Sequence, residues 1–139
     1  MNFEKFKEYF NERDLFSINS GMKLVELGEG YAKVELTIEK KSKNFMGSMH
    51  GGLLYSMADV AAGASMVFCG KQVVTLSAAT DYIKPAFSGK VIAEGKVIAY
   101  GKTLGRCEVE VRGEDGTFYS KSHITMFITN NNEVVVSDY

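Results

Sequence analysis

GGLLYSMADVAAGASMVFCG, residues 51–70, is the stretch that decides which fold this sequence adopts. Asp59 is its only formal charge, and its apolar residues fall on every side of a helix instead of forming one stripe. The stretch is rich in Gly, Ala and Ser, and a charge at a bilayer centre costs about 3 kcal/mol, so we expect a buried helix and not a membrane span. The helix is expected to run from Gly51 to about Phe68, to end at Cys69-Gly70, and to be enclosed by other structure.

The segments on both sides of this helix have the alternating pattern of β-strands. Pro85 ends the first strand downstream, because proline cannot continue a ladder, and Asp115-Gly116 predicts a hairpin. Sequential strands joined by hairpins favour an antiparallel sheet, so the expected fold class is α+β, with one sheet wrapped around one long helix. The strands are expected at residues 22–27, 31–38, 73–83, 91–100, 104–112 and 117–129.

The chain as a whole has the size of one domain, residues 1–139. We expect an N-terminal helix over residues 3–13 within a lead-in of residues 1–20, and a tail over residues 130–139 that opens with a turn at its three asparagines. Apolar residues make up 45% of the chain and charged residues 24%, which is typical of a globular protein.

Charge and cysteine content exclude several classes of partner. The formal net charge of −1 offers no basic excess for a nucleic acid or an anionic membrane, so we expect neither partner. Cys69 and Cys107 are too few for a disulfide scaffold and lack metal-ligand spacing. A reducing cytoplasm fits this cysteine usage best.

Asp59 is the residue that packing alone explains least well. An aspartate among Met57, Ala58 and Val60 has poor helix propensity, and burying it unpaired costs free energy. It could be a surface residue at a helix edge, or a buried residue satisfied by backbone and hydroxyl groups. It could also be a carboxylate held in a site as a general base or nucleophile.

The segment NFMGSMHGG, residues 44–52, precedes the helix and adds a second candidate group. Two glycines that open a helix leave backbone N–H groups accessible at its positive end, where they can polarise a carbonyl or hold an oxyanion. His-Gly-Gly by itself could be only a tight turn. The combination is more informative, because Asn44 lies six residues before His50 and Asp59 nine residues after it.

The pattern Asn44-x-x-Gly47-x-x-His50-Gly51-Gly52, followed by Ala58-Asp59, resembles the signature of the hotdog-fold acyl-CoA thioesterases of the phenylacetate-pathway (PaaI-like) group. Residues 75–86, the turn at residues 101–106 and the closing hairpin are similar to the later strands of that family. The resemblance covers about residues 20–130 and is most specific over residues 44–59. It implies a hotdog fold and hydrolysis of acyl-CoA thioesters without a metal or an organic cofactor.

The resemblance also implies roles for the residues of the motif. The N–H of Gly51 would polarise the thioester carbonyl, and Asp59 would act as general base or nucleophile. Asn44 would orient the attacking water or the carboxylate. His50 would shape the turn and hydrogen-bond near the carbonyl without acting as the base.

A hydroxyl residue on the strand after the helix completes the catalytic set that the resemblance implies. Thr75 holds this position by its spacing from Tyr82. Ser77 is the alternative, because it lies two residues further and is expected to face the same side of the strand.

Helix geometry leads to an expectation about assembly that does not depend on the family. If Gly51 opens the helix, Asp59 lies about 12 Å along it at 1.5 Å per residue. A near-attack contact is about 3–3.5 Å, so one thioester carbon cannot touch both groups of one chain. If both groups act, two antiparallel copies must supply them, and we expect a dimer or a dimer of dimers.

Basic residues near the turns are candidates for contacts with the phosphates of coenzyme A. Lys84 and Lys90 flank the turn after Pro85, and Lys102 and Arg106 flank the next turn, although any solvated turn carries lysines. Gly52 and Ser77 complete the predicted substrate-binding set.

Two other functions remain open. A non-catalytic acyl-CoA-binding or regulatory module of the same fold would not need the carboxylate of Asp59 or the amide of Asn44. A hydratase or dehydratase of this fold would pair a histidine with a carboxylate, but neither His50 nor His123 lies in an Asp-x-x-x-x-His arrangement.

Overall fold

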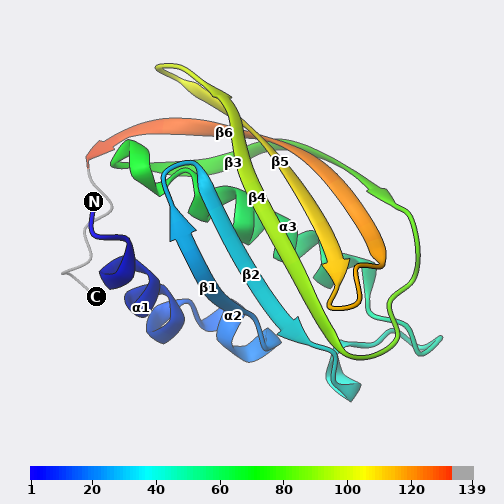
Figure 1. Cartoon of the computed structure of the whole chain (residues 1–139). Helices are drawn as coiled ribbons and strands as arrows, with labels where there is room; N and C mark the ends of the chain where they lie inside the picture. The colour runs from blue at the N-terminus through cyan, green and yellow to red at the C-terminus, as the bar shows by residue number, and fades with distance from the viewer. Residues whose placement is uncertain (133–139) are drawn as a thin grey trace.

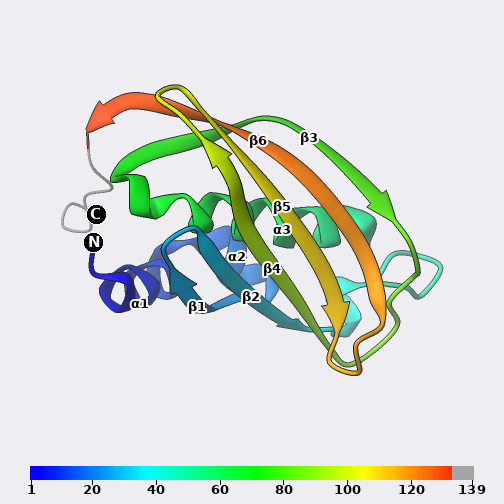
Figure 2. The same cartoon turned by 45° about the horizontal axis from the view of Figure 1, so that its top comes forward.

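The computed structural model describes residues 1–132 of the chain, with side chains described as far as Thr129. One six-stranded antiparallel sheet, in the order β1-β2-β4-β5-β6-β3, curves around the long helix α3 (Figures 1 and 2). This architecture confirms the predicted fold class. The strands are β1 (Lys23–Gly28), β2 (Tyr31–Thr37), β3 (Lys71–Tyr82), β4 (Lys90–Tyr100), β5 (Leu104–Gly113) and β6 (Phe118–Asn132). The helices are α1 (Phe3–Arg13), α2 (Leu15–Ser20) and α3 (Gly51–Ser65), with 3-10 turns η1 (Lys40–Ser42) and η2 (Val67–Cys69).

Helix α3 packs one side against the middle of the sheet, on β2, β4 and β5. Met57, Ala58 and Ala61 are fully buried there. The contact is close, because a Cβ on Gly95 of β4 would lie 2.7 Å from the carbonyl oxygen of Ala61. Glycine at this position therefore lets the helix approach the sheet backbone.

The opposite side of α3 has no cover within the described part of the chain. Gly52 is exposed, and Ser56, Asp59, Val60 and Gly63 are half-buried. The prediction of a helix enclosed on all sides was therefore wrong for a single chain, because the sheet covers only part of its circumference. From Gly51 to Cys69 the segment is long and apolar enough to cross a membrane by length and composition, and half of it is buried inside this fold.

Three differences from the predictions exceed two residues or concern a whole element, whereas the other helix and strand ends lie within two residues of their predicted positions. The α-helix ends at Ser65 and not near Phe68, because the N–H of Met66 bonds to Gly63 O, three residues back, and the chain tightens into η2. Helix α2 was missed, since six residues are too few to show a helical period.

The third difference concerns the predicted turn at residues 130–132. These residues continue β6, where Lys71 at the start of β3 pairs with Asn132. The remainder of the predicted tail, residues 133–139, lies outside the described residues.

The two edges of the sheet are treated differently. At β1, the side chain of Asn11 on α1 accepts a hydrogen bond from Leu24 N–H at 2.9 Å and donates one to Leu24 C=O at 2.8 Å. At β3, one side pairs with β6, and no described residue pairs with the other side. Val74 and Leu76 of β3 are more than half exposed.

Candidate active site

The first residue of α3, Gly51, lies between two hydrogen-bonded peptide groups. The C=O of the preceding residue, His50, accepts bonds from Leu53 N–H at 2.9 Å and Leu54 N–H at 3.2 Å. On the other side, the hydroxyl of Tyr82 donates to Gly51 C=O at 2.9 Å. The N–H of Gly51 has no intrahelical acceptor, because it belongs to the first turn. It is therefore a fixed donor at the positive end of the helix.

His50 caps this helix with its side chain. Its Nδ1 accepts a hydrogen bond from Gly52 N–H at 2.9 Å, which leaves Nε2 as the ring nitrogen that can carry a proton. This contact agrees with the predicted role of His50 in shaping the turn. It also means that the N–H of Gly52, a predicted substrate contact, is already bonded within the chain.

Asp59 and Thr75 meet where α3 passes β3. The Thr75 hydroxyl donates to Asp59 Oδ1 at 2.5 Å, so the spacing argument for this threonine selected the residue that touches the carboxylate. Asp59 is half-buried and Thr75 is exposed in the single chain. One carboxylate oxygen is thus satisfied by a hydroxyl, and the pair lies on the uncovered side of the helix.

Tyr55 lies on the same side of α3, one turn from Gly51 and one turn from Asp59. Burial raises the pKa of Tyr55 above its ordinary value, and the nearby Asp59 and Tyr82 raise it further. The phenol therefore stays protonated at neutral pH. Sequence reasoning did not find the contact of Tyr82 with Gly51, because a tyrosine at the end of a strand carries no spacing signal toward a helix 31 residues upstream.

The side chain of Asn44 closes its own loop. Its Oδ1 accepts from Met46 N–H at 3.0 Å and from Ser48 N–H at 3.2 Å, and its Nδ2 donates to Ser48 Oγ at 3.1 Å. The 44–48 loop is therefore rigidly tied together. Within one chain Asn44 contacts neither Asp59 nor Gly51.

Ser77 lies on the other face of the sheet from Thr75, so the expectation that both face the same side was wrong. The register pairs Thr75 with the buried Met126, whereas Ser77 pairs with Thr125, the next residue of β6. A β-bulge at Leu76 causes this shift, because one extra residue reverses the alternation of side chains.

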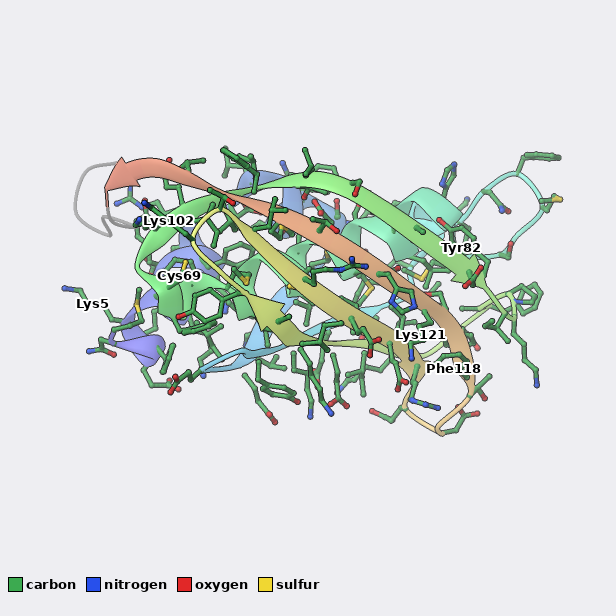
Figure 3. All side chains as sticks on the ribbon, turned by 90° about the horizontal axis from the view of Figure 1, so that it is seen from above. Lys5, Cys69, Tyr82, Lys102, Phe118 and Lys121 are labelled. Atoms are coloured by element: carbon green, nitrogen blue, oxygen red, sulfur yellow. The ribbon has the colours of Figure 1, made fainter. Side chains whose placement is uncertain are left out.

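The four predicted phosphate contacts do not gather in one chain. Lys90 and Lys102 flank the two ends of β4, about 30 Å apart at the rise of a strand, and Figure 3 shows Lys102 at the opposite end of the molecule from Tyr82. Lys90 also pairs with Glu35 and Glu114, each at 3.6 Å. Lys84 follows β3 at the Tyr82 end, and Arg106 lies on β5 opposite Ala99.

The geometry of α3 keeps the two candidate groups apart. The helix is unbroken from Gly51 to Ser65, so the Gly51 N–H and the Asp59 carboxylate are separated by about 12 Å along its axis. A single chain therefore carries the N–H of Gly51 at one end of α3 and the carboxylate–hydroxyl pair of Asp59 and Thr75 at its middle.

Comparisons with known proteins agree with this fold and motif. The model of the thioesterase superfamily matches residues 46–119, which include the start of α3, Asp59 and Thr75. The acyl-coenzyme A thioesterase PaaI of Escherichia coli K12 is 29% identical over 117 residues, covering 81% of this chain and 84% of that protein.

Two solved structures are also similar. A mutant of the phenylacetic acid degradation protein PaaI from Thermus thermophilus has a TM-score of 0.79 and 29% identity, covering 84% of this chain and all of that one. The protein smu.793 of Streptococcus mutans UA159, solved bound to acetyl CoA, has a TM-score of 0.76 and 25% identity, covering 81% of this chain and 91% of that one. The family model, which spans just over half of the chain, and the helix-in-sheet architecture lead to one conclusion: this protein belongs to the thioesterase superfamily and has its hotdog fold.

Proposed function

We propose that this protein hydrolyses acyl-CoA thioesters in a site shared by two chains, with Gly51 from one chain and Asp59 from the other. The observation that carries this proposal is the separation of about 12 Å between two groups that thioester hydrolysis needs at one carbon. The substrate class is supported by the relatives named above, one called an acyl-coenzyme A thioesterase and one solved with acetyl CoA.

Two surfaces of the chain support the second copy. The uncovered side of α3 carries the small residues Gly52, Ser56 and Gly63, which allow another helix to approach closely. Among the described residues, the outer side of β3 has no backbone partner, and together with exposed Leu76 it is available for pairing with another strand. An antiparallel partner on both surfaces would bring its Asp59 toward the first turn of α3, at the Gly51 end.

The proposed reaction begins with the thioester carbonyl oxygen accepting a hydrogen bond from Gly51 N–H. Asp59 of the partner subunit, held by its own threonine, removes a proton from water as the water oxygen attacks the carbonyl carbon. The tetrahedral intermediate carries its negative charge on the oxygen that faces Gly51. Its collapse breaks the C–S bond, and the protonated carboxyl returns the proton to the thiolate, which gives free acid and CoA thiol.

A second route uses Asp59 as the nucleophile. Its carboxylate oxygen then attacks the carbonyl carbon and expels the thiolate, and water hydrolyses the mixed anhydride that remains. A single turnover in oxygen-18 water distinguishes the routes. Label in the Asp59 carboxylate indicates the nucleophilic route with water attacking the aspartyl carbon of the anhydride. Label in the product acid alone, with no anhydride trapped by hydroxylamine, indicates the general-base route.

The experiment that tests the function is release of free thiol from a panel of acyl-CoAs, followed with a thiol reagent. Hydrolysis of one or more short, medium or aromatic acyl-CoAs is the expected result. Binding of acyl-CoAs without thiol release would instead indicate the non-catalytic module. Hydration of an enoyl-CoA with the thioester left intact would indicate the hydratase.

A further inference from the structure

An open pocket of about 570 Å³ lies beside the first turn of α3. Its walls come from α2, from the segment around η1 and from α3 itself. Phe16 and Asn19 line it on the α2 side, Lys41 and Lys43 on the η1 side, and His50, Gly52, Leu53 and Ser56 on the helix side. Gly52 and Ser56 also belong to the side of α3 that the proposed partner helix would approach, so the pocket borders that surface. The pocket is therefore continuous with the residues that hold Gly51.

Hydrogen bonds tie these walls together. Lys43 forms a β-bridge with Met49, and the N–H of His50 donates to Ser42 C=O at 2.9 Å. The Nζ of Lys41 donates to Asn19 C=O at 3.0 Å, which links the η1 segment to α2. The volume is in the range of small-molecule sites, and its boundary is built from anchored backbone.

The pocket lining combines apolar, hydrogen-bonding and positively charged side chains. Phe16 is 60% exposed, although it is a large apolar residue, and with half-buried Leu53 it offers an apolar surface. The amide of Asn19 and the hydroxyl of Ser20 offer hydrogen bonds, whereas the hydroxyls of Ser42 and Ser56 already bond to Glu39 N–H and Gly52 C=O. Lys41 forms an ion pair with Glu39 at 3.5 Å, whereas Lys43 forms no ion pair with any residue of the described chain.

We propose that this pocket binds the pantetheine arm of coenzyme A and that Lys43 contacts its pyrophosphate. The arm carries two amides and a dimethyl group, which suit the polar and apolar parts of the lining, and the pyrophosphate needs a cation that is not already paired. The inference rests on the proposed function, because it assumes a CoA thioester whose carbonyl lies at Gly51. It places the phosphate contact on the η1 segment and not on the four turn residues expected from the sequence.

The test compares three thioesters of one acyl group: the acyl-CoA, the acyl-pantetheine without phosphates, and the acyl-N-acetylcysteamine without most of the arm. Lys43→Glu should raise KM for the acyl-CoA about tenfold and leave KM for the acyl-pantetheine unchanged. Lys43→Arg should keep the wild-type KM. Phe16→Ser should raise KM for both longer thioesters about threefold and leave that of acyl-N-acetylcysteamine unchanged. Lys5→Glu on α1 is the matched charge control.

Calorimetric binding of coenzyme A separates failure of the inference from failure of the proposed function. If the protein binds CoA but hydrolyses no thioester, the function is wrong, and a weaker affinity in Lys43→Glu still supports the pocket. If hydrolysis occurs and Lys43→Glu leaves KM for acyl-CoA unchanged, the pocket assignment is wrong. An equal rise of KM for all three thioesters would also overturn it, because it would indicate a local distortion and not a lost phosphate contact.

Discussion

The two edge strands of the sheet, β1 and β3, differ in whether their outer backbone groups have partners within the chain. Helix α1 covers β1, and Asn11 satisfies both backbone groups of Leu24 there, so this edge is closed within the chain. At β3 even inward-facing residues such as Thr75 and Ala78 are exposed, and the outer side is unpaired among the described residues. The open edge is therefore the surface that is available for pairing with the second chain that we propose.

The candidate site lies on the open side of the sheet. Asp59, Thr75 and Tyr82 all belong to β3 or to the helix face beside it, whereas the β1 edge carries only packing and edge-capping contacts among the described residues. The incompletely buried edge and the candidate site therefore have a common location. Substitutions on this side of the molecule test that link.

Replacing Asp59 with alanine should have the largest effect. We expect kcat to fall at least a hundredfold, because the site loses the carboxylate that activates water, while the affinity for acyl-CoA is kept. The helix should tolerate the change, since alanine is the better helix former. Steady-state kinetics and acyl-CoA binding measure the two parts, and near-normal turnover would remove Asp59 from its role.

Removing the N–H of Gly51 should lower kcat about a hundredfold. Gly51→Pro deletes only this donor, because proline is accepted at the first helical position and His50 already has the extended backbone that a following proline requires. Gly51→Ala is the matched control. It keeps the N–H, and its Cβ would lie 3.5 Å from the ring of Tyr82, an ordinary contact distance. Equal activities of the two variants would contradict the proposed role.

Mixing these two inactive chains tests whether the site is shared. A dimer of one Asp59→Ala chain and one Gly51→Pro chain has one site with both groups intact. After denaturation and refolding together, random pairing should restore about a quarter of the wild-type activity. No recovery, with mixed dimers present, would show that each site belongs to one chain.

A charge at the open edge should separate the chains. Leu76→Lys places a cation on the unpaired side of β3 and should give a monomer whose activity is reduced about tenfold or more. Light scattering during size-exclusion chromatography measures the assembly. Ile98→Lys on β4 is the control, because Ile98 is also about half exposed but lies away from this edge. A monomer with full activity would defeat the two-chain site.

Loss of the threonine hydroxyl should have a smaller effect. Thr75→Val keeps the shape of the side chain and removes the hydrogen bond to Asp59, so we expect kcat to fall about tenfold. Thr75→Ser should restore most of the rate. If Ser77→Ala lowered kcat more than Thr75→Val, the assignment from the strand register would be wrong.

Alkylation of the cysteines should have the smallest effect. Cys107 is buried, and burial raises the pKa of its thiol, so it should react only when the protein unfolds. Cys69 is half-buried and should react in the folded protein without loss of activity. Mass spectrometry with parallel assays measures both, and inactivation on modification of Cys69 alone would contradict this expectation.

Elements could be predicted from the local sequence where a single hydrophobic pattern or a single turn motif determines them. The start of α3 was predictable because His-Gly-Gly is followed by a run with few charges. The hairpin was predictable because Asp-Gly favours a tight turn, in which glycine readily adopts positive φ. Gly116 has a φ of 89° in the structure. The end of α3 was not predictable, because the chain tightens from α-helix into the 3-10 turn η2 inside one continuous apolar run. The length of β6 was not predictable, because it depends on a partner outside the segment, Lys71 for Asn132.

The position of the helix and the separation of Gly51 from Asp59 follow from the local sequence, because the rise of an α-helix is set by its backbone. Which side chains contact these two groups depends on how the strands pair and pack. A bulge at Leu76 turns Thr75 and not Ser77 toward the helix, and the end of β3 sets Tyr82 on Gly51. The physical reason is that the register and edge of a sheet depend on pairing between strands, which no single segment contains.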